Sequence, residues 1–93
     1  MVTAFVMFIV EPGRVTAIAE RLLEVPGIAE VHSVAGPYDL VAIARVKKHE
    51  ELADLVADHV AHIEGIERTE TLIAFRAYSK RDLGLMWDVG ASD

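Results

Sequence analysis

The feature that most constrains this chain is a run of small and branched apolar residues at positions 40–46, which directly follows a turn around Gly36 and Pro37. Glycine lacks steric restriction and proline lacks a backbone N–H, so this pair cannot lie inside a regular helix or a central strand. Both alternating faces of the run after the turn are apolar, which is typical of a strand covered on both sides. Tyr38 and Asp39 are thereby placed in the turn, at the mouth of a buried strand.

The N-terminal segment, residues 2–10, repeats this two-sided apolar pattern. Glu11 and Pro12 interrupt the run well before it reaches the length of a membrane span, and no basic region precedes it as in a signal peptide. The pattern therefore predicts a strand with both faces buried. Its alternating sets are Thr3, Phe5, Met7 and Ile9 on one face and Val2, Ala4, Val6, Phe8 and Val10 on the other.

Two segments carry apolar residues at helical spacing and charged residues on the opposite side, the pattern of amphipathic helices. The first spans residues 15–22, with Pro-Gly steps at 12–13 before it and at 26–27 after it. The second spans residues 49–63, and Gly65 is its expected C-terminal cap. The apolar stripes are Val15, Ile18, Ala19 and Leu22 in the first helix and Leu52, Leu55, Val56, Val60 and Ile63 in the second.

Two further alternating segments, residues 28–35 and 66–78, complete a predicted order of strand, helix, strand, strand, helix, strand. The turn at Gly36 pairs residues 28–35 with residues 40–46 as an antiparallel hairpin. A faint internal repeat indicates two similar halves, because Val-Pro-Gly-Ile after the first helix is echoed by Ile-Glu-Gly-Ile after the second. We therefore predict an α+β fold, a ferredoxin-like βαββαβ unit with a four-stranded antiparallel sheet and both helices on one face.

This arrangement leaves one face of the sheet bare, although the strands are apolar on both faces. At ~25 cal/mol per Å² of apolar surface, exposing several such side chains forfeits several kcal/mol, which is comparable with the stability of a whole small domain. A second sheet should cover this face, and another copy of the chain is its simplest source. We expect two copies to pack sheet against sheet as a dimeric α/β barrel-like sandwich.

Composition restricts the classes of function. The 93 residues are expected to form one domain, and their net charge of −6 comes with nine scattered Lys and Arg residues that form no basic stripe. Direct nucleic-acid binding is therefore disfavoured. The absence of cysteine removes disulfides, thiolate nucleophiles and cysteine-based zinc sites, and it is compatible with a cytoplasmic location. We expect no cofactor.

The histidines do not define a catalytic or metal centre. His59 and His62 lie three apart on a predicted helix beside Asp58, but no third ligand is specified, so a solvated or interface helix face is the simpler interpretation. His32 lies on a mixed strand and is interpreted as a partly buried histidine rather than a catalytic base. No nucleophile and base occur at a recognisable spacing, so we predict that the protein is not an enzyme.

Three motifs together carry a resemblance to a known family. The order of elements, the Gly-Pro-Tyr-Asp turn at residues 36–39 and the Gly-Ile step at 65–66 that leads into Thr-Glu-Thr at 69–71 resemble the effector-binding RAM domain of the Lrp/AsnC transcription regulators. The resemblance covers nearly all of residues 1–78, and residues 79–93 are treated as a C-terminal arm. Regulators of this family carry an N-terminal helix-turn-helix domain, whereas the first strand here begins at residue 2. The chain is therefore similar to the stand-alone RAM proteins.

The resemblance implies a sensing function. Stand-alone RAM modules are implied to form homodimers through their sheets, to assemble further into rings that are often octamers, and to bind small amino acids between dimers. It implies regulation of transcription or metabolism through ligand-dependent assembly, without direct contact to nucleic acid or membrane. The partners implied are an amino acid or related metabolite, further copies of the chain and a DNA-binding relative.

The turn can be tested against the chemistry of such a ligand. An amino acid presents an ammonium, a carboxylate and a side chain, and so needs an anion, backbone donors and a shaped pocket. Asp39 supplies the anion and the turn supplies backbone donors, with hydroxyls from the last strand if it lies nearby. The alternative is that Asp39 only stabilises its own turn and Tyr38 packs as an interface aromatic. The candidate ligand-binding residues are Gly36, Pro37, Tyr38, Asp39, Leu40, Thr69 and Thr71.

Two other functions stay open at this point. Small dimeric α/β-barrel enzymes, such as oxygenases and isomerases, share this fold, and a fold does not determine a function. A structural partner that co-assembles with a DNA-binding relative is the second. The role of the arm is also open, because its Leu85, Met86 and Trp87 are compatible with docking on the same or a neighbouring subunit and with a partly ordered tail.

Overall fold

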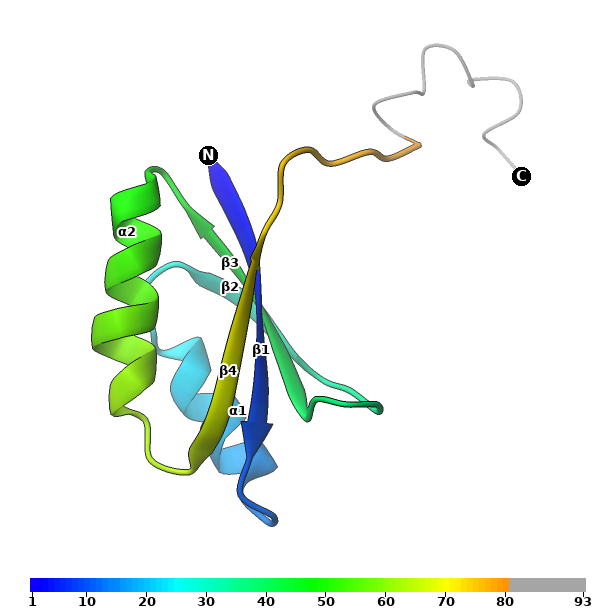
Figure 1. Ribbon diagram of the computed structural model, residues 1–93, viewed down its shortest axis with the longest axis vertical. Coiled ribbons are helices and arrows are strands. Elements are labelled where there is room, and N and C mark those ends of the chain that lie inside the picture. The colour runs from blue at the N-terminus through cyan, green and yellow to red at the C-terminus, as the bar shows by residue number, and fades with distance from the viewer. Residues whose placement is uncertain (81–93) are drawn as a thin grey trace.

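The computed structural model describes residues 1–80, in which one four-stranded antiparallel sheet carries the helices on one of its faces (Figure 1). The order of the strands across the sheet is β2-β3-β1-β4. The predicted ferredoxin-like βαββαβ fold is therefore confirmed. The elements are β1 (Val2–Val10), α1 (Val15–Leu23), β2 (Ile28–Ser33), β3 (Leu40–Val46), α2 (His49–Asp54), η1 (Leu55–His59), η2 (Val60–His62) and β4 (Ile66–Ile73).

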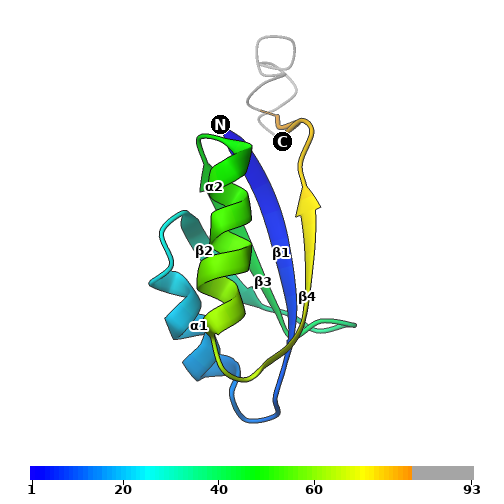
Figure 2. The same cartoon turned by 60° about the vertical axis from the view of Figure 1, so that its left-hand side comes forward.

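The face of the sheet that the helices cover, called the inner face below, holds the core (Figure 2). Each of the two central strands turns one alternating set of side chains towards it. Ile18 and Leu22 from α1 and Leu52 from α2 pack into the same core. The inner-face residues of the central strands, all buried, are Ala4, Val6, Phe8 and Val10 on β1 and Leu40, Ala42, Ala44 and Val46 on β3.

The opposite face of the sheet, called the outer face below, is left uncovered by the helices. Phe5 on β1 is paired with Ile43 on β3 and with Leu72 on β4, so the three side chains form one row. Phe5 is 37% exposed and Leu72 is 51% exposed. The outer face consists of Thr3, Phe5, Met7 and Ile9 on β1, Val41, Ile43 and Arg45 on β3, Glu30 and His32 on β2, and Arg68, Glu70 and Leu72 on β4.

The two edge strands are shorter than the sequence predicts. Strand β2 ends at Ser33 rather than at residue 35, because the N–H of Val34 donates to the carbonyl of Asp39 (3.0 Å) and closes the hairpin. Strand β4 ends at Ile73 rather than at residue 78. Beyond Ala74, whose N–H donates to the carbonyl of Thr3 (2.9 Å), only Val2 of β1 remains as a possible partner. The predicted docking of the C-terminal arm falls almost wholly on residues outside those described.

The second helical segment occupies the predicted place but is not a uniform α-helix. The regular helix α2 continues into the π-helical turn η1 and the short 3₁₀ turn η2. In the π turn the N–H of Val60 donates to the carbonyl of Leu55, five residues back. Because a π turn contains more residues than an α turn, Leu55 and Val60 both face the core, where they are 1% and 2% exposed. None of the helices in residues 1–80 is long and apolar enough to cross a membrane.

The internal repeat corresponds to two equivalent glycines that follow the helices and precede the edge strands. Gly27 and Gly65 have φ values of +98° and +94°, which favour glycine. The carbonyl of Gly27 accepts the N–H of Arg45 (2.7 Å), and that of Gly65 accepts the N–H of Glu11 (2.8 Å). Each glycine therefore attaches an edge strand to the end of a central strand.

Candidate ligand-binding site

Asp39 fixes the hairpin loop to the end of β1. Its N–H donates to the carbonyl of Phe8 (2.8 Å), and its carboxylate Oδ2 accepts the N–H of Val10 (2.9 Å). The last residue pair between β1 and β3 joins Phe8 to Leu40, so β3 has no backbone acceptor left for Val10. The side chain of Asp39 supplies that acceptor, which gives it a stabilising role in its own turn. Its second oxygen, Oδ1, has no hydrogen-bond partner among residues 1–80.

Tyr38 connects the same loop to the far edge of the sheet. Its hydroxyl donates to Oε1 of Glu70, which lies on the outer face of β4 opposite Met7. The pKa of the Tyr38 phenol is raised, first by the hydrogen bond to Glu70, then by desolvation and by the negative charge of this carboxylate, while Arg68 acts in the opposite direction. The contact joins residues 32 positions apart in the sequence.

Glu70 is the residue at this site that sequence reasoning missed. The alternating pattern of the last strand places it on the opposite face from Thr69 and Thr71, between Arg68 and Leu72 and opposite Met7. A long carboxylate on the face of the sheet that also carries Phe5 and Met7 was the available signal. Its partner could not be named without the order of the strands.

The other predicted residues are distributed over two faces. Gly36 and Pro37 are exposed in the loop, and Leu40 is fully buried in the core. Thr69 and Thr71 are half-buried on the inner face of β4, where they pair with Phe8 and Val6. The structure therefore brings Tyr38 to Glu70, and it places the two threonines on the opposite side of the sheet.

The threonines also line hollows that do not include the loop. Thr71 lines an open apolar groove of about 310 Å³ between α2 and β4, next to Leu52 and Val56. Thr69 lines a smaller hollow of about 160 Å³ beside Val60. Within one copy of the chain, the hydroxyls of these two threonines therefore face spaces other than the surroundings of residues 36–39.

The histidines lie outside this arrangement. His32 is exposed rather than partly buried, because β2 is an edge strand and its outer face is uncovered, and its Nε2 lies 3.4 Å from Oε1 of Glu30. The ring Nδ1 of His62 is hydrogen-bonded to the main-chain carbonyl of Asp58. Among residues 1–80, no group of three or more His, Cys, Asp or Glu side chains could hold a metal ion.

Comparison with known sequences gives a family match across the chain. Residues 3–83 match the family model described as the Lrp/AsnC ligand binding domain. The HTH-type transcriptional regulator FL11 of Pyrococcus furiosus is 35% identical over 79 residues, which cover 85% of this chain and 52% of the regulator. The chain thus spans about half the length of the curated relatives it matches.

Comparison with solved structures agrees with this match. The crystal structure of TTHA0845 from Thermus thermophilus is 54% identical, with a TM-score of 0.80 over 85% of this chain and 99% of that one. The transcriptional regulator NMB0573 from Neisseria meningitidis, solved as a complex with L-Met, has a TM-score of 0.75 over 84% of this chain and 52% of that one. Its identity is 12%, so this second likeness shows the fold alone.

Proposed function

The chain belongs to the Lrp/AsnC ligand-binding domain family, whose members are regulatory domains rather than enzymes, and from this premise we propose that it senses an amino acid or a related small metabolite. The output of sensing is a change in assembly between copies of the chain. Through that change the protein regulates transcription or metabolism in the cytoplasm.

The observation that carries this proposal is the hydrogen bond from Tyr38 to Glu70. It links the exposed hairpin loop to the outer face of the sheet, which is the surface left for contact with another copy. A ligand that engages the loop therefore acts on a side chain of the assembly surface. Loop and surface form one connected unit in the fold.

The outer face has the composition of an association surface. Its centre is apolar and is formed by Phe5, Met7 and Ile9 on β1 and by Val41 and Ile43 on β3. Charged and polar side chains surround it, with Glu30 and His32 on β2, Arg68 and Glu70 on β4, and the Thr3–Arg45 pair at one end. Protein interfaces combine an apolar core with a polar rim in the same way. We assign this face to a homodimer, and further contacts between dimers build the larger ring.

The proposed ligand contacts come from the loop and its partner strand. Oδ1 of Asp39 and the carboxylate of Glu70 are available to an ammonium group, and the exposed backbone around Gly36 is available to a carboxylate. The loop is open on one copy, so a second dimer is needed to enclose the ligand. The L-Met complex of NMB0573 supports an amino acid as the ligand class. Leu40, Thr69 and Thr71 support the loop and β4 from the inner face.

Regulation by this route has a thermodynamic condition. A ligand shifts an equilibrium between assembly states only if it binds one state more tightly than the other. A site that is completed by a second dimer satisfies the condition, because the ligand then makes contacts in the larger assembly that the separate dimer lacks. Ligand binding should therefore increase the assembly size, and dilution should weaken ligand binding.

The test is a thermal-shift screen of the twenty amino acids, followed by sedimentation velocity with and without each stabilising compound. A ligand at about 100 times its Kd stabilises the state it binds by about 2.7 kcal/mol, which gives a clear rise in Tm. Glu70→Gln and Tyr38→Phe should abolish the response while the protein stays folded. Glu20→Gln, the same change on an exposed residue of α1, is the matched control.

Asp39→Ala is a poor probe of binding, because it also removes the acceptor of the Val10 N–H. The sensing proposal is abandoned if no amino acid shifts the Tm at millimolar concentration. If the protein instead co-purifies with a DNA-binding relative and ignores amino acids, it acts as a structural partner. A stable monomer at micromolar concentration would refute the role assigned to the outer face.

A further inference from the structure

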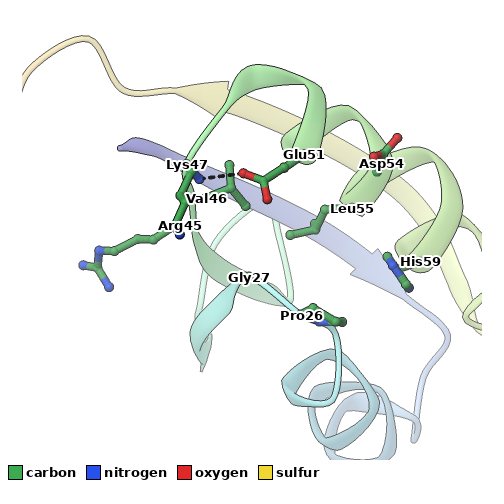
Figure 3. A pocket seen from close by; sticks show the side chains of 9 residues that line it. All are labelled: Pro26, Gly27, Arg45, Val46, Lys47, Glu51, Asp54, Leu55 and His59. Carbon is green, nitrogen blue, oxygen red and sulfur yellow. Dashed lines mark hydrogen bonds between the residues drawn. The ribbon is translucent and has the colours of Figure 1, made fainter.

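We propose that a second hollow, at the opposite end of β3 from the hairpin loop, binds a small organic cation, namely a primary amine that carries an apolar group (Figure 3). The hollow has a volume of about 410 Å³. Its walls are the turn between α1 and β2, the end of β3, and the segment formed by α2 and η1. Ligand sites in proteins typically measure about 300–1,000 Å³, so the space is sufficient for a small molecule.

The floor of the hollow is apolar. Val46 and Leu55 are buried, and the side chain of Leu55 points from the helical segment towards Gly27 (Figure 3). A Cβ atom on Gly27 would lie 2.9 Å from Cγ1 of Val46 and 3.0 Å from Cδ1 of Leu55, so a side chain at this position would require Val46 to shift. Pro26 extends the apolar lining. Val46 and Leu55 are the buried base of the hollow, and the exposed ring of Pro26 is the apolar surface most available to the hydrocarbon part of a ligand.

One wall carries two carboxylates, of which the first is held in place. Oε1 of Glu51 accepts the main-chain N–H groups of Lys47 and Lys48, both at 2.9 Å. Oε2 of Glu51 and the carboxylate of Asp54, one helical turn further on, have no partners among residues 1–80. A carboxylate that is already oriented loses less side-chain freedom when a ligand binds. This wall therefore suits an ammonium group.

The cations of the lining do not cancel this wall. The side chain of Arg45 points away from the hollow in Figure 3, in keeping with its place on the outer face. Lys47 contributes the main-chain N–H that orients Glu51, and its own side chain is exposed. His59 adds an imidazole, which has a nitrogen able to accept from an ammonium group. The net charge of −6 also favours the approach of a cation.

The irregular helical turn supports the same location. Leu55 and His59 are the first and last residues of the π turn, and both line the hollow. Single π turns in otherwise α-helical segments are found frequently at functional sites. The turn is thus an observation separate from the charges. An anionic ligand would face Glu51 and Asp54, and a purely apolar one would leave both without a partner, so an amine with an apolar group fits the lining best.

The experiment is a titration of the full ¹⁵N-labelled chain with benzylamine, followed by amide chemical shifts. Benzyl alcohol has the same ring without charge, and benzoate has the same ring with the opposite charge. Benzylamine should shift the amides of Gly27, Val46 and Glu51 in a saturable manner at millimolar concentration. The two control compounds should bind at least about tenfold more weakly, because a hydrogen bond to a charged group contributes about 1.5–3 kcal/mol.

Variants separate a site from general attraction to an acidic protein. Asp54→Asn should weaken benzylamine binding several-fold, whereas Asp58→Asn makes the same change of charge on the next turn and should not. Neither carboxylate has a structural contact in residues 1–80, so both variants should fold. Glu70→Gln, which disables the proposed amino-acid site, should leave benzylamine binding unchanged.

Three results of the benzylamine titration would overturn the proposal, and one would support it. Equal shifts with all three compounds mean that the ring alone adsorbs to the apolar floor, which overturns the proposal. Equal weakening by Asp54→Asn and Asp58→Asn means attraction by net charge, and absence of shifts at millimolar benzylamine means no site; either result also overturns it. Saturable binding that depends on Asp54 and on the amine charge supports it, whatever the result of the amino-acid screen.

Discussion

The inner and outer faces of the sheet are built from similar side chains on the same strands, yet their surroundings differ. On β1, Val6 and Phe8 are fully buried beneath the helices, while the neighbouring Phe5 is 37% exposed. Composition does not cause this difference, because both alternating sets of the strand are apolar. The connections cause it, since both helices return to the same side of the sheet (Figure 2).

An apolar face on a strand determines one property of the fold and leaves another open. It specifies that a cover is needed, because exposed apolar surface is unfavourable in water. It does not specify whether that cover comes from the same copy or from another. The inner face should therefore determine the stability of one copy, and the outer face should determine association between copies.

The largest expected effect is a loss in the free energy of unfolding when a side chain of the inner face is truncated. Phe8→Ala removes a fully buried ring from the inner face, and such a truncation costs about 3–5 kcal/mol. A domain of this kind has about 5–15 kcal/mol in total, so the variant should lose a large fraction of its stability. Urea denaturation followed by circular dichroism measures the loss.

The matched control is Phe5→Ala, the same truncation on the same strand but on the outer face of the sheet. At concentrations where copies are dissociated, it should cost much less than Phe8→Ala, because its ring is already in contact with solvent. If both truncations cost the same under those conditions, the two faces contribute equally to one copy, and the distinction fails.

The next effect is a weaker association between copies when a charge is placed on the outer face. Ile43→Lys places a charge in the apolar row between Phe5 and Glu30, so a dimer through this face would have to bury that charge. Although the carboxylate of Glu30 lies opposite this lysine, removing the charges from water in a dimer interface costs several kcal/mol, so the dimer Kd should rise at least about 100-fold. Sedimentation velocity measures this, while circular dichroism should show an unchanged fold.

Thr16→Lys adds the same charge to an exposed position of α1 and controls for the change in net charge. It should leave association unchanged. Identical sedimentation of Ile43→Lys and the unaltered protein would mean that the outer face is not where the copies meet.

A smaller effect is expected where the hairpin loop joins the end of β1. Asp39→Ala leaves the N–H of Val10 without its acceptor, and an unsatisfied group of this kind costs about 1–3 kcal/mol. Urea denaturation should show the loss, and hydrogen exchange of the Val10 amide should accelerate. Asp39→Asn keeps a carbonyl oxygen and should cost less. Equal losses in both variants would mean that the charge of Asp39, rather than its role as an acceptor, stabilises the loop.

The smallest effect concerns the contact that crosses the outer face. Glu70 raises the pKa of Tyr38, so Glu70→Gln should bring that pKa back towards the usual tyrosine value of about 10. The pKa of Tyr38 is higher in the folded protein than in the unfolded chain. The hydrogen bond therefore contributes fully to the free energy of unfolding at pH values below the usual tyrosine pKa. This contribution is lost as the pH rises through the raised pKa of the folded state. Ultraviolet absorbance titration measures the change in the pKa of Tyr38. Tyr38→Phe lacks the phenol and so identifies which titration step belongs to this residue. An unchanged titration in Glu70→Gln would contradict the contact.

Most of the fold could be predicted from local patterns. Helical spacing located both helical segments, and the Gly-Pro step located the hairpin. The repeated glycine after each helix indicated two equivalent halves, and Gly27 and Gly65 have matching backbone conformations. These features depend on neighbouring residues, so a single sequence contains them.

The choice of the covered face could not be predicted, because Phe5 and Phe8 are chemically equivalent until the helices are placed. The lengths of the edge strands also depended on distant partners, as β4 ends opposite Ala4, close to the start of β1. The π turn was not predicted either, although the five-residue spacing of Leu55 and Val60, which fits the stripe of an ordinary helix only approximately, was a signal for it.

The candidate site was predictable in its loop but not in its contacts. Tyr38 and Asp39 could be selected because a hydroxyl and a carboxylate stand in a turn beside a buried strand. Their partners, Glu70 and Val10, are 32 and 29 residues away in the sequence. Only the order of the strands brings these residues together, and the same order places Thr69 and Thr71 on the other face.

The position of β1 in the centre of the sheet has a consequence for synthesis on the ribosome. Its two neighbours, β3 and β4, begin at Leu40 and Ile66, so neither exists when β1 is made. At a translation rate of about 5–20 residues per second, β4 is complete roughly 3–13 seconds after β1. During that time a strand that is apolar on both faces has open edges, which is the condition under which nascent chains aggregate. Among the four described strands, the one in the middle of the finished sheet is thus the one that spends the longest time unpaired during synthesis.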